Sequence, residues 1–168
     1  AVVLKPAGQT PFTAIELAEL LLDRCGLPAG WLHVVTGSGR EVGNALVHHD
    51  DVAMITFTGS PEVGWGIRAE APRKRVSLEL GNNAPVIIQP DGAWEQAASK
   101  IAVAGTSHAG QSCISVQRVL VHRDIADPFV ERLVDAVESL VVGDPLDDAT
   151  QVSALISQDD RDRVRSWI

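Results

Sequence analysis

Two side chains in the sequence could take part in covalent catalysis: the thiol of Cys113 and the carboxylate of Glu79. Cys113 stands among small and polar residues in the segment SHAGQSCISVQR, residues 107–118. A thiolate is a strong nucleophile that forms thioesters, and a carboxylate can activate water as a general base. Both residues also have an ordinary interpretation, because free cysteines are often small buried hydrophobes and a lone glutamate usually lies in water. The residues by themselves leave both interpretations open.

Glu79 stands in the segment SLELGNN, at the end of a run that is otherwise apolar. A general base works best when its pKa is raised toward neutrality, and partial burial of a carboxylate has that effect. A catalytic Glu79 is therefore expected to be partly buried, whereas a structural Glu79 would be solvated at a strand edge.

Three further features carry less weight. Cys25, in the segment LLDRCG, lies on an amphipathic helix and is interpreted as structural. His108 precedes Cys113 by five residues, which is not the spacing of papain-type Cys–His pairs. His48 and His49 are adjacent, but no third ligand of the right kind stands nearby, so we predict no metal site.

Two glycine turns follow predicted strands and precede predicted helices, as a phosphate-binding turn would. The first, residues 37–43, has the spacing G-x-G-x-x-x-G, one residue longer than the dinucleotide fingerprint, so a plain tight turn is an equal alternative. In the second, FTGSPEVG, Gly59 allows close approach to the backbone and Ser60 offers a hydroxyl at a helix start. We expect the two turns at adjacent strand ends of a parallel sheet, where ligands bind in such folds.

The elements that must position these residues alternate between strand and helix. Short apolar runs predict strands over residues 1–4, 31–35, 52–59, 75–81, 84–89 and 118–122. Helical spacing predicts helices over residues 11–25, 93–110 and 125–143, one beginning after Ser60 and one beginning near residue 157. Thr10 and Pro11 are expected to start the first helix and Gly26 to end it. This order predicts the α/β class with a mostly parallel sheet.

The composition excludes several classes of function. The 168 residues carry 14 Lys and Arg against 22 Asp and Glu, a formal net charge of −8, which argues against a nucleic-acid partner. No apolar run is long enough to span a membrane. The two cysteines form neither a disulfide framework nor a metal motif, which favours a reducing, cytoplasmic setting. The chain begins within an apolar run and stops within a predicted helix, so we expect a segment of a longer chain.

Taken in order, these features resemble the NAD(P)-dependent aldehyde dehydrogenase superfamily. The matching stretches are KPAGQTP, LPAGWLHVVTGSG, ITFTGSPEVG, LELGNNAPVII and AGQSCISVQRVLVH. The resemblance covers essentially the whole chain. It implies a parallel-sheet, Rossmann-like part of a cofactor domain over residues 1–81, followed by the first part of an α/β catalytic domain over residues 82–168.

The resemblance assigns a role to each candidate residue. Cys113 matches the nucleophile that attacks the aldehyde, and Glu79 matches the residue that activates water to cleave the thioester. NAD or NADP is the implied hydride acceptor. The positions that match the family's cofactor site are Lys5, Gly8, Gly59, Ser60, Val63, Leu80 and Gly81. The turn at residues 37–43 is implied to be mainly structural. The implied partners are an aldehyde and, in the full-length form, further copies of the chain in a dimer or tetramer.

Two departures from the family pattern stand out. Gly8 occupies a position where a glutamate often faces the ribose 2′-hydroxyl, and its absence predicts tolerance of NADP as well as NAD. Asn82 and Asn83 replace the commoner Gly-Lys or Gly-Ser, with no assigned consequence. Because the family's oxyanion asparagine and much of its substrate tunnel match no residues here, the isolated chain is expected to be poorly active or inactive.

Two alternatives to a hydrolytic aldehyde dehydrogenase remain at this stage. One is an inactive remnant that at most binds cofactor. The other is an acylating dehydrogenase that passes the acyl group to coenzyme A, which Glu79 disfavours because a water-activating base would waste that group.

Overall fold

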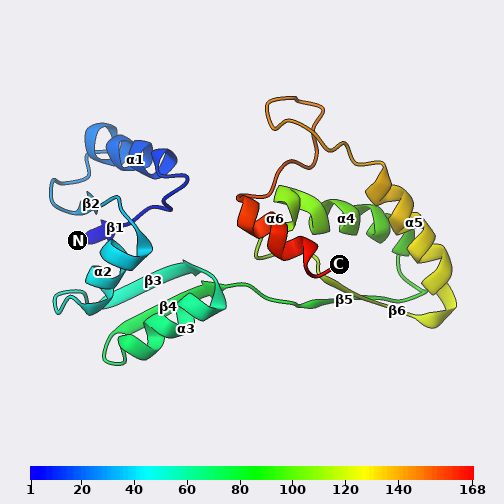
Figure 1. The fold of residues 1–168 in the computed structure, drawn as a ribbon, viewed down its shortest axis with the longest axis horizontal. Helices are drawn as coiled ribbons and strands as arrows, with labels where there is room; N and C mark the ends of the chain where they lie inside the picture. The colour runs from blue at the N-terminus through cyan, green and yellow to red at the C-terminus, as the bar shows by residue number, and fades with distance from the viewer. The chain divides into compact units, whose positions relative to one another are not determined.

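The computed structural model describes residues 1–168, which form two compact units, Ala1–Glu79 and Leu80–Ile168. Each unit has its own strands and helices (Figure 1). The α/β class predicted from the sequence is confirmed, because parallel strand pairs alternate with helices along the chain. No helix is both long enough and apolar enough to cross a membrane.

The first unit contains four strands and the helices that connect them. They are β1 (Val2–Leu4), α1 (Phe12–Glu19), the π-helical turn η1 (Leu20–Arg24), β2 (Leu32–Val34), the π-helical turn η2 (Gly39–Gly43), α2 (Asn44–His48), β3 (Met54–Gly59), α3 (Pro61–Glu70) and β4 (Arg75–Leu80). β1 and β2 pair in parallel, from Val2 opposite Leu32 to Leu4 opposite Val34. β3 pairs with β4, and the Arg75 N–H donates to the Ala53 carbonyl at 3.1 Å, so the two strands begin at the same end.

The helix boundaries follow local chemistry. The Ser60 Oγ accepts from the Val63 N–H at 3.4 Å and Pro61 opens α3, as predicted. Gly26, at φ +71°, ends the first helical segment as predicted, because its left-handed conformation turns the chain out of the helix. The predicted cap at Thr10 is wrong: α1 begins one residue later, and the Pro11 carbonyl accepts its first bond, from the Ile15 N–H at 3.1 Å.

The second unit is built on one pair of strands. Its elements are β5 (Pro85–Ile88), α4 (Trp94–Thr106), the 3₁₀ segment η3 (Ser107–Gly110), β6 (Arg118–Val121), the 3₁₀ turn η4 (Arg123–Ile125), α5 (Ala126–Glu138) and α6 (Gln158–Arg165). β5 and β6 are parallel, from Pro85 opposite Arg118 to Ile88 opposite Val121. The predicted helix over residues 93–110 ends earlier, at Thr106.

A single apolar core holds the second unit together. Ile88 from β5, Ala98 and Ile101 from α4, and Phe129 from α5 are buried in contact with one another. Figure 1 shows α4 and α5 on the same side of the β5–β6 pair, which is the face that carries these residues. The unit is therefore a two-layer arrangement of helices on strands, and this frame fixes both ends of the segment that contains Cys113.

The strands form three separate two-stranded sheets rather than one continuous sheet. β2 and β3, whose glycine turns were expected side by side, belong to different sheets. β2 contributes only three residues and uses them to pair with β1. The expectation that both glycine turns lie at adjacent strand ends is therefore wrong for this structure.

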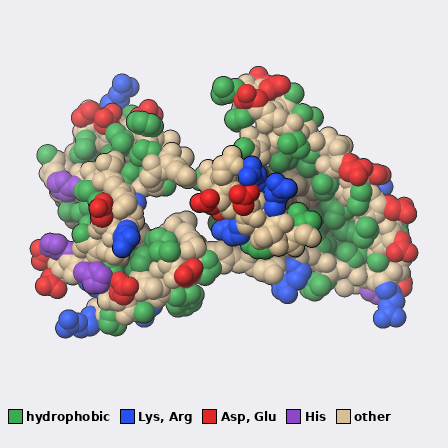
Figure 2. Space-filling view, in the orientation of Figure 1, with side chains coloured by type: hydrophobic (Ala, Val, Ile, Leu, Met, Phe, Trp, Pro, Cys, Tyr) green, Lys and Arg blue, Asp and Glu red, His purple; other side chains and the backbone are tan.

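Many large apolar side chains lie at the surface of both units. Figure 2 shows hydrophobic groups among the charged ones on the visible face of each. Trp31 is 61% exposed, Ile114 is 82% exposed and Leu146 is 92% exposed. The chain buries its core but leaves much apolar surface in contact with water.

Candidate functional site

Cys113 lies in an irregular connection between α4 and β6, residues 107–117, which we call the Cys113 loop. The thiol is free and exposed rather than buried as a core hydrophobe. The interpretation of Cys113 as an inert buried side chain does not fit this position. An exposed thiol on a loop held by a rigid frame can meet a small-molecule electrophile.

The Cys113 loop leaves α4 through a run of left-handed residues. His108 and Ala109 have φ values of 51° and 55°, and Gly110 follows at 76°. Side chains rarely adopt this conformation, which costs about 1–2 kcal/mol per residue other than glycine. The helix predicted to continue to residue 110 ends at Thr106, because Ser107, with ψ of 136°, already leaves the helical conformation before the left-handed residues begin.

Side-chain hydrogen bonds hold the middle of the loop. Gln111 uses both ends of its amide: its Nε2 donates to the His108 carbonyl at 2.8 Å, and its Oε1 accepts from the Ile156 N–H at 2.8 Å. The second bond ties the loop to the segment just before α6. Ser115, which is buried, donates from its hydroxyl to the Gly110 carbonyl at 3.2 Å. The thiol is thus exposed on a loop whose backbone is constrained on both sides.

The segment after β4 also reaches this loop. The Asn82 Nδ2 donates to the Cys113 carbonyl, and the Asn82 Oδ1 accepts from the Ala84 N–H at 2.9 Å. The Arg118 guanidinium donates to the Asn83 carbonyl at 3.1 Å. The parallel pairing of Pro85 with Arg118 brings these two stretches together.

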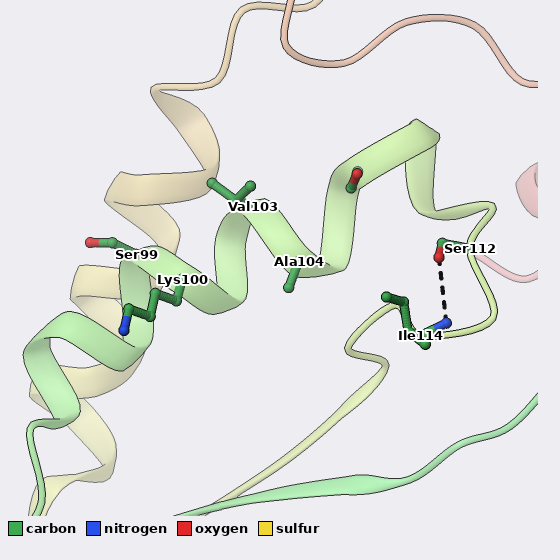
Figure 3. Close-up of a pocket in the computed structure, with 7 residues that line it drawn as sticks. Ser99, Lys100, Val103, Ala104, Ser112 and Ile114 are labelled. Atoms are coloured by element: carbon green, nitrogen blue, oxygen red, sulfur yellow. Dashed lines mark hydrogen bonds between the residues drawn. The ribbon is translucent and has the colours of Figure 1, made fainter.

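A hollow of about 500 Å³ lies between α4 and the Cys113 loop. Figure 3 shows its lining side chains from both elements, with a hydrogen bond from the Ile114 N–H to the Ser112 Oγ at 3.4 Å. The residues that line it are Ser99, Lys100, Val103, Ala104, Ser107, Ser112 and Ile114. Space for a small organic molecule therefore adjoins the residues on either side of Cys113.

Glu79 is placed differently from the expectation for a buried base. β4 alternates, so Arg75, Ser77 and Glu79 are exposed on one face while the residues between them are half-buried. The partial burial expected of a catalytic Glu79 is absent from this chain. Glu79 closes the first unit, and Cys113 belongs to the second.

Cys25 is exposed as well, at the residue that follows η1. The interpretation of Cys25 as structural therefore cannot rest on burial. Both cysteines are exposed, so exposure does not tell which one is the better candidate nucleophile. Cys113 differs from Cys25 because side-chain hydrogen bonds from Gln111 and Asn82 hold the loop around it.

The first unit has a hollow of about 310 Å³ that contains Gly8. The lining residues are Pro6, Ala7, Gly8, Pro11, Thr36, Gly37 and Ser38. Lys5 precedes it and is half-buried, with its Nζ donating to the Pro6 carbonyl at 2.8 Å. A lysine ammonium, two hydroxyls and an open glycine are groups that suit the hydroxyls and phosphates of a nucleotide. The residues at this hollow therefore fit part of a dinucleotide.

The turn between β3 and α3 contains three more of the predicted cofactor residues. A Cβ atom on Gly59 would lie 2.5 Å from the Phe57 ring, so a larger residue here would require that ring to move. Ser60 caps α3, and Val63 is 51% exposed in the first turn of that helix. The free N–H groups at the start of α3 give this turn a partial positive charge, which suits a phosphate.

The last two predicted cofactor positions, Leu80 and Gly81, lie next to each other at the end of β4. Leu80 is half-buried, and Gly81 is exposed beside it.

The adjacent histidines considered as metal ligands lie on the surface of the first unit. The His48 Nε2 lies 3.3 Å from the Glu70 Oε2. No cluster of three or more potential metal ligands occurs in the chain.

Reasoning from the sequence missed the roles of Asn82, Gln111 and Arg118 in holding the Cys113 loop. Gln111 stood only within the quoted segment around the thiol, and Asn82 was given no consequence. The available signal was the polar side chain itself, since amides in irregular segments often bind backbone groups. Their partners depend on the β5–β6 pairing and could not be found by spacing.

The chain matches the family model described as "Aldehyde dehydrogenase family" over residues 1–168. It is 48% identical over 168 residues to 3-sulfolactaldehyde dehydrogenase of Priestia megaterium, covering 100% of this chain and 35% of that protein. It is 42% identical over 158 residues to the NADP-dependent succinate-semialdehyde dehydrogenase of Escherichia coli, covering 93% of this chain and 33% of that protein. The chain therefore spans about a third of the length of the curated relatives it matches.

Solved structures agree with this similarity. The crystal structure of an NAD-dependent aldehyde dehydrogenase from Sinorhizobium meliloti superposes with a TM-score of 0.95 at 42% identity, over 99% of this chain and 33% of that one. An indole-3-acetaldehyde dehydrogenase in complex with NAD⁺ superposes with a TM-score of 0.94 at 38% identity, over 99% of this chain and 34% of that one. The fold described above is thus shared with enzymes of known structure.

Proposed function

Because the chain belongs to the aldehyde dehydrogenase family, we propose that its residues oxidise an aldehyde to a carboxylate with NAD or NADP as the hydride acceptor. The observation that carries the proposal is the match to the family over residues 1–168. The exposed thiol on a hydrogen-bonded loop supports it, because the chemistry needs an accessible and oriented nucleophile.

The proposed reaction begins when the Cys113 thiolate attacks the carbonyl carbon of the aldehyde and forms a thiohemiacetal. The structure leaves the Cys113 N–H without an acceptor in the chain, so this group is free to donate to the oxyanion. When bound, the oxidised nicotinamide supplies a two-electron acceptor for the hydride that leaves the substrate carbon. A thioester on Cys113 remains.

The second half of the proposed reaction is hydrolysis. Glu79 takes a proton from water, the resulting hydroxide attacks the thioester, and the carboxylate product leaves as the Cys113 thiolate is regenerated. Glu79 is exposed in this chain, so the role requires a more desolvated position in the active enzyme. A carboxylate near a thiol also disfavours the thiolate, and a movable Glu79 avoids that conflict.

For cofactor binding, we propose that residues of the first unit, together with Leu80 and Gly81 directly after them in the chain, hold the dinucleotide. Lys5 and Gly8 would face the adenosine ribose, and Gly59, Ser60 and Val63 would contact the pyrophosphate and the adenine pocket. Leu80 and Gly81 would present backbone near the nicotinamide. The hollow around Gly8 and the capped start of α3 support this assignment because both offer donors to anionic or hydroxylated groups.

The direct test is the formation of NADH or NADPH, followed by absorbance, with a panel of aldehydes. Cofactor reduction that is lost in Cys113→Ala and retained in Cys25→Ala would support the proposal, because both variants remove one exposed thiol. The expected loss is at least about 10³-fold, since removing a nucleophile abolishes the covalent route. Equal activity in the two variants would contradict Cys113 as the nucleophile.

Two narrower alternatives have their own tests. In the first, the chain binds cofactor without turnover. Binding of NAD⁺ measured by calorimetry, with no reduction in the assay above, would support that alternative. In the second, the acyl group passes to coenzyme A, and formation of an acyl-coenzyme A product would overturn hydrolytic deacylation.

The resemblance also implies a dimer or tetramer for the whole enzyme. Light scattering of the native mass would measure it.

A further inference from the structure

We propose that Asn82 is a positioning residue for Cys113, acting through the peptide group that joins Cys113 to Ile114. This inference rests on the proposed function, since it assumes that Cys113 is the nucleophile. It begins from the Asn82 amide, which donates to the Cys113 carbonyl and accepts from the Ala84 N–H at 2.9 Å. An amide has separate donor and acceptor ends, so one side chain can make both bonds at once.

The peptide group after Cys113 is held from two sides. Its carbonyl accepts the bond from Asn82, and its N–H, which belongs to Ile114, donates to the Ser112 Oγ at 3.4 Å. Fixing this group fixes the backbone torsion ψ of Cys113. This restrains the direction of the Cα–Cβ bond that carries the thiol, and of the Cys113 N–H, relative to that peptide group.

Asn82 is itself anchored to the frame of the second unit. Three residues further on, the chain enters β5, which pairs with β6 from Pro85 opposite Arg118. The Arg118 guanidinium donates to the Asn83 carbonyl at 3.1 Å. The short segment before β5 is therefore fixed against the start of β6. The Asn82 side chain on this segment in turn restrains the position of the Cys113 carbonyl.

Asn82 complements the contact made by Gln111. Gln111 holds the loop before the thiol through the Ile156 N–H, and Asn82 holds it after the thiol. Misplacement of a reacting group by about 1 Å can cost about 10²-fold in rate, so a tether at this point has a direct catalytic consequence. The unexplained departure at residue 82 thereby acquires a function in this chain.

The test uses three variants in a Cys25→Ser background, in which Cys113 is the remaining thiol. Asn82→Ala removes both bonds of the amide. Asn82→Asp keeps the acceptor for the Ala84 N–H but replaces the donor with a carboxylate. Asn83→Ala is the matched control, because the structure gives the Asn83 side chain no hydrogen bond and the variant keeps the carbonyl that binds Arg118. Far-UV circular dichroism establishes that each variant is folded.

The first readout is hydrogen exchange of the Ile114 and Ser115 amides, measured by NMR. Loss of one hydrogen bond is expected to speed exchange about two- to tenfold in Asn82→Ala, with no change in Asn83→Ala.

The second readout is the pH profile of Cys113 alkylation by iodoacetamide. Asn82→Asp is expected to move its midpoint upward, because a nearby carboxylate disfavours the thiolate, and Asn83→Ala is expected to leave it in place.

The two proposals fail in distinguishable ways. Exchange and alkylation that are the same in the Asn82 variants and in Asn83→Ala would overturn the positioning role, whatever the catalytic activity. Turnover that survives Cys113→Ala would overturn the proposed function, whatever the exchange rates. In the enzyme assay, the positioning role requires that Asn82→Ala lower kcat about 10- to 100-fold while the KM for the dinucleotide stays within about twofold.

Discussion

Gly8 is the residue at which cofactor preference is open to a direct test. It lines the hollow in the first unit, and a Cβ atom built on it would meet no atom within 4 Å. A larger side chain therefore fits without a clash. We expect Gly8→Glu to weaken NADP binding relative to NAD by about tenfold, because the carboxylate would repel the 2′-phosphate. The measurement is the ratio of the two dissociation constants, from titration with each cofactor.

Gly8→Gln is the matched control for that experiment. Its side chain has nearly the same size as glutamate but carries no charge, so the NADP-to-NAD ratio should stay close to that of the unchanged chain. An equal change of the ratio in both variants would show that volume rather than charge decides. An unchanged ratio in Gly8→Glu, with NADP already binding far more weakly than NAD, would show that position 8 does not face the 2′-position.

The sequence names the reactive candidates, whose roles stay predictions, but it does not give their surroundings. Cys113 was distinguished by its small polar neighbours, and the structure places it on an exposed loop. The burial expected for Glu79 is missing because β4 presents that side chain on its exposed face. The contact from Asn82 could not be predicted, since it joins residues that are adjacent only after β5 and β6 have paired.

Helix α5 supplies the largest fully buried side chain in the core of the second unit. Phe129 is 1% exposed and contacts the buried residues of α4 and β5. We expect Phe129→Ala to lower the free energy of unfolding by about 3–5 kcal/mol, because it removes a large apolar side chain and leaves a cavity. Urea unfolding followed by circular dichroism measures this, and Trp94, which packs against the same cluster, offers a fluorescence signal.

Val130 provides the comparison on the same helix. It is 52% exposed, so Val130→Ala removes little buried surface and should change stability by less than about 1 kcal/mol. Similar destabilisation by both substitutions would mean that α5 does not pack as described.

The elements themselves were largely predictable, but their pairing was not. Apolar runs and helical spacing placed all six strands and the main helices near their observed positions. The end of α4 was missed because Ser107 leaves the helical conformation and His108 and Ala109 are left-handed, which is uncommon for residues other than glycine and is not reported by helical spacing. The expected neighbourhood of β2 and β3 was wrong because pairing depends on contacts far apart in sequence, which periodicity does not report.

For the whole molecule, the exposed apolar surface predicts a tendency to associate. Val142, Leu146 and Ile114 are 75%, 92% and 82% exposed in the second unit, and Trp31 and Trp65 are 61% and 63% exposed in the first. Surfaces of this kind favour contact with other apolar surfaces. We expect the isolated chain to bind the dye ANS and its mean mass to rise with concentration, measured by static light scattering. A constant monomer mass with no dye binding would contradict this.

The rate at which the Lys74 amine is acetylated can report on local opening in the first unit. It is half-buried, and its Nζ donates to the carbonyls of Val47 at 2.7 Å and His49 at 2.6 Å, where α2 ends. Acylating reagents attack only the unprotonated, accessible amine, and this ammonium is occupied by two acceptors. Of the three lysines in the chain, Lys74 should therefore be acetylated more slowly than the exposed Lys100. The ratio of label at these two positions, read by mass spectrometry, would then report how often the end of α2 comes away from the start of β4.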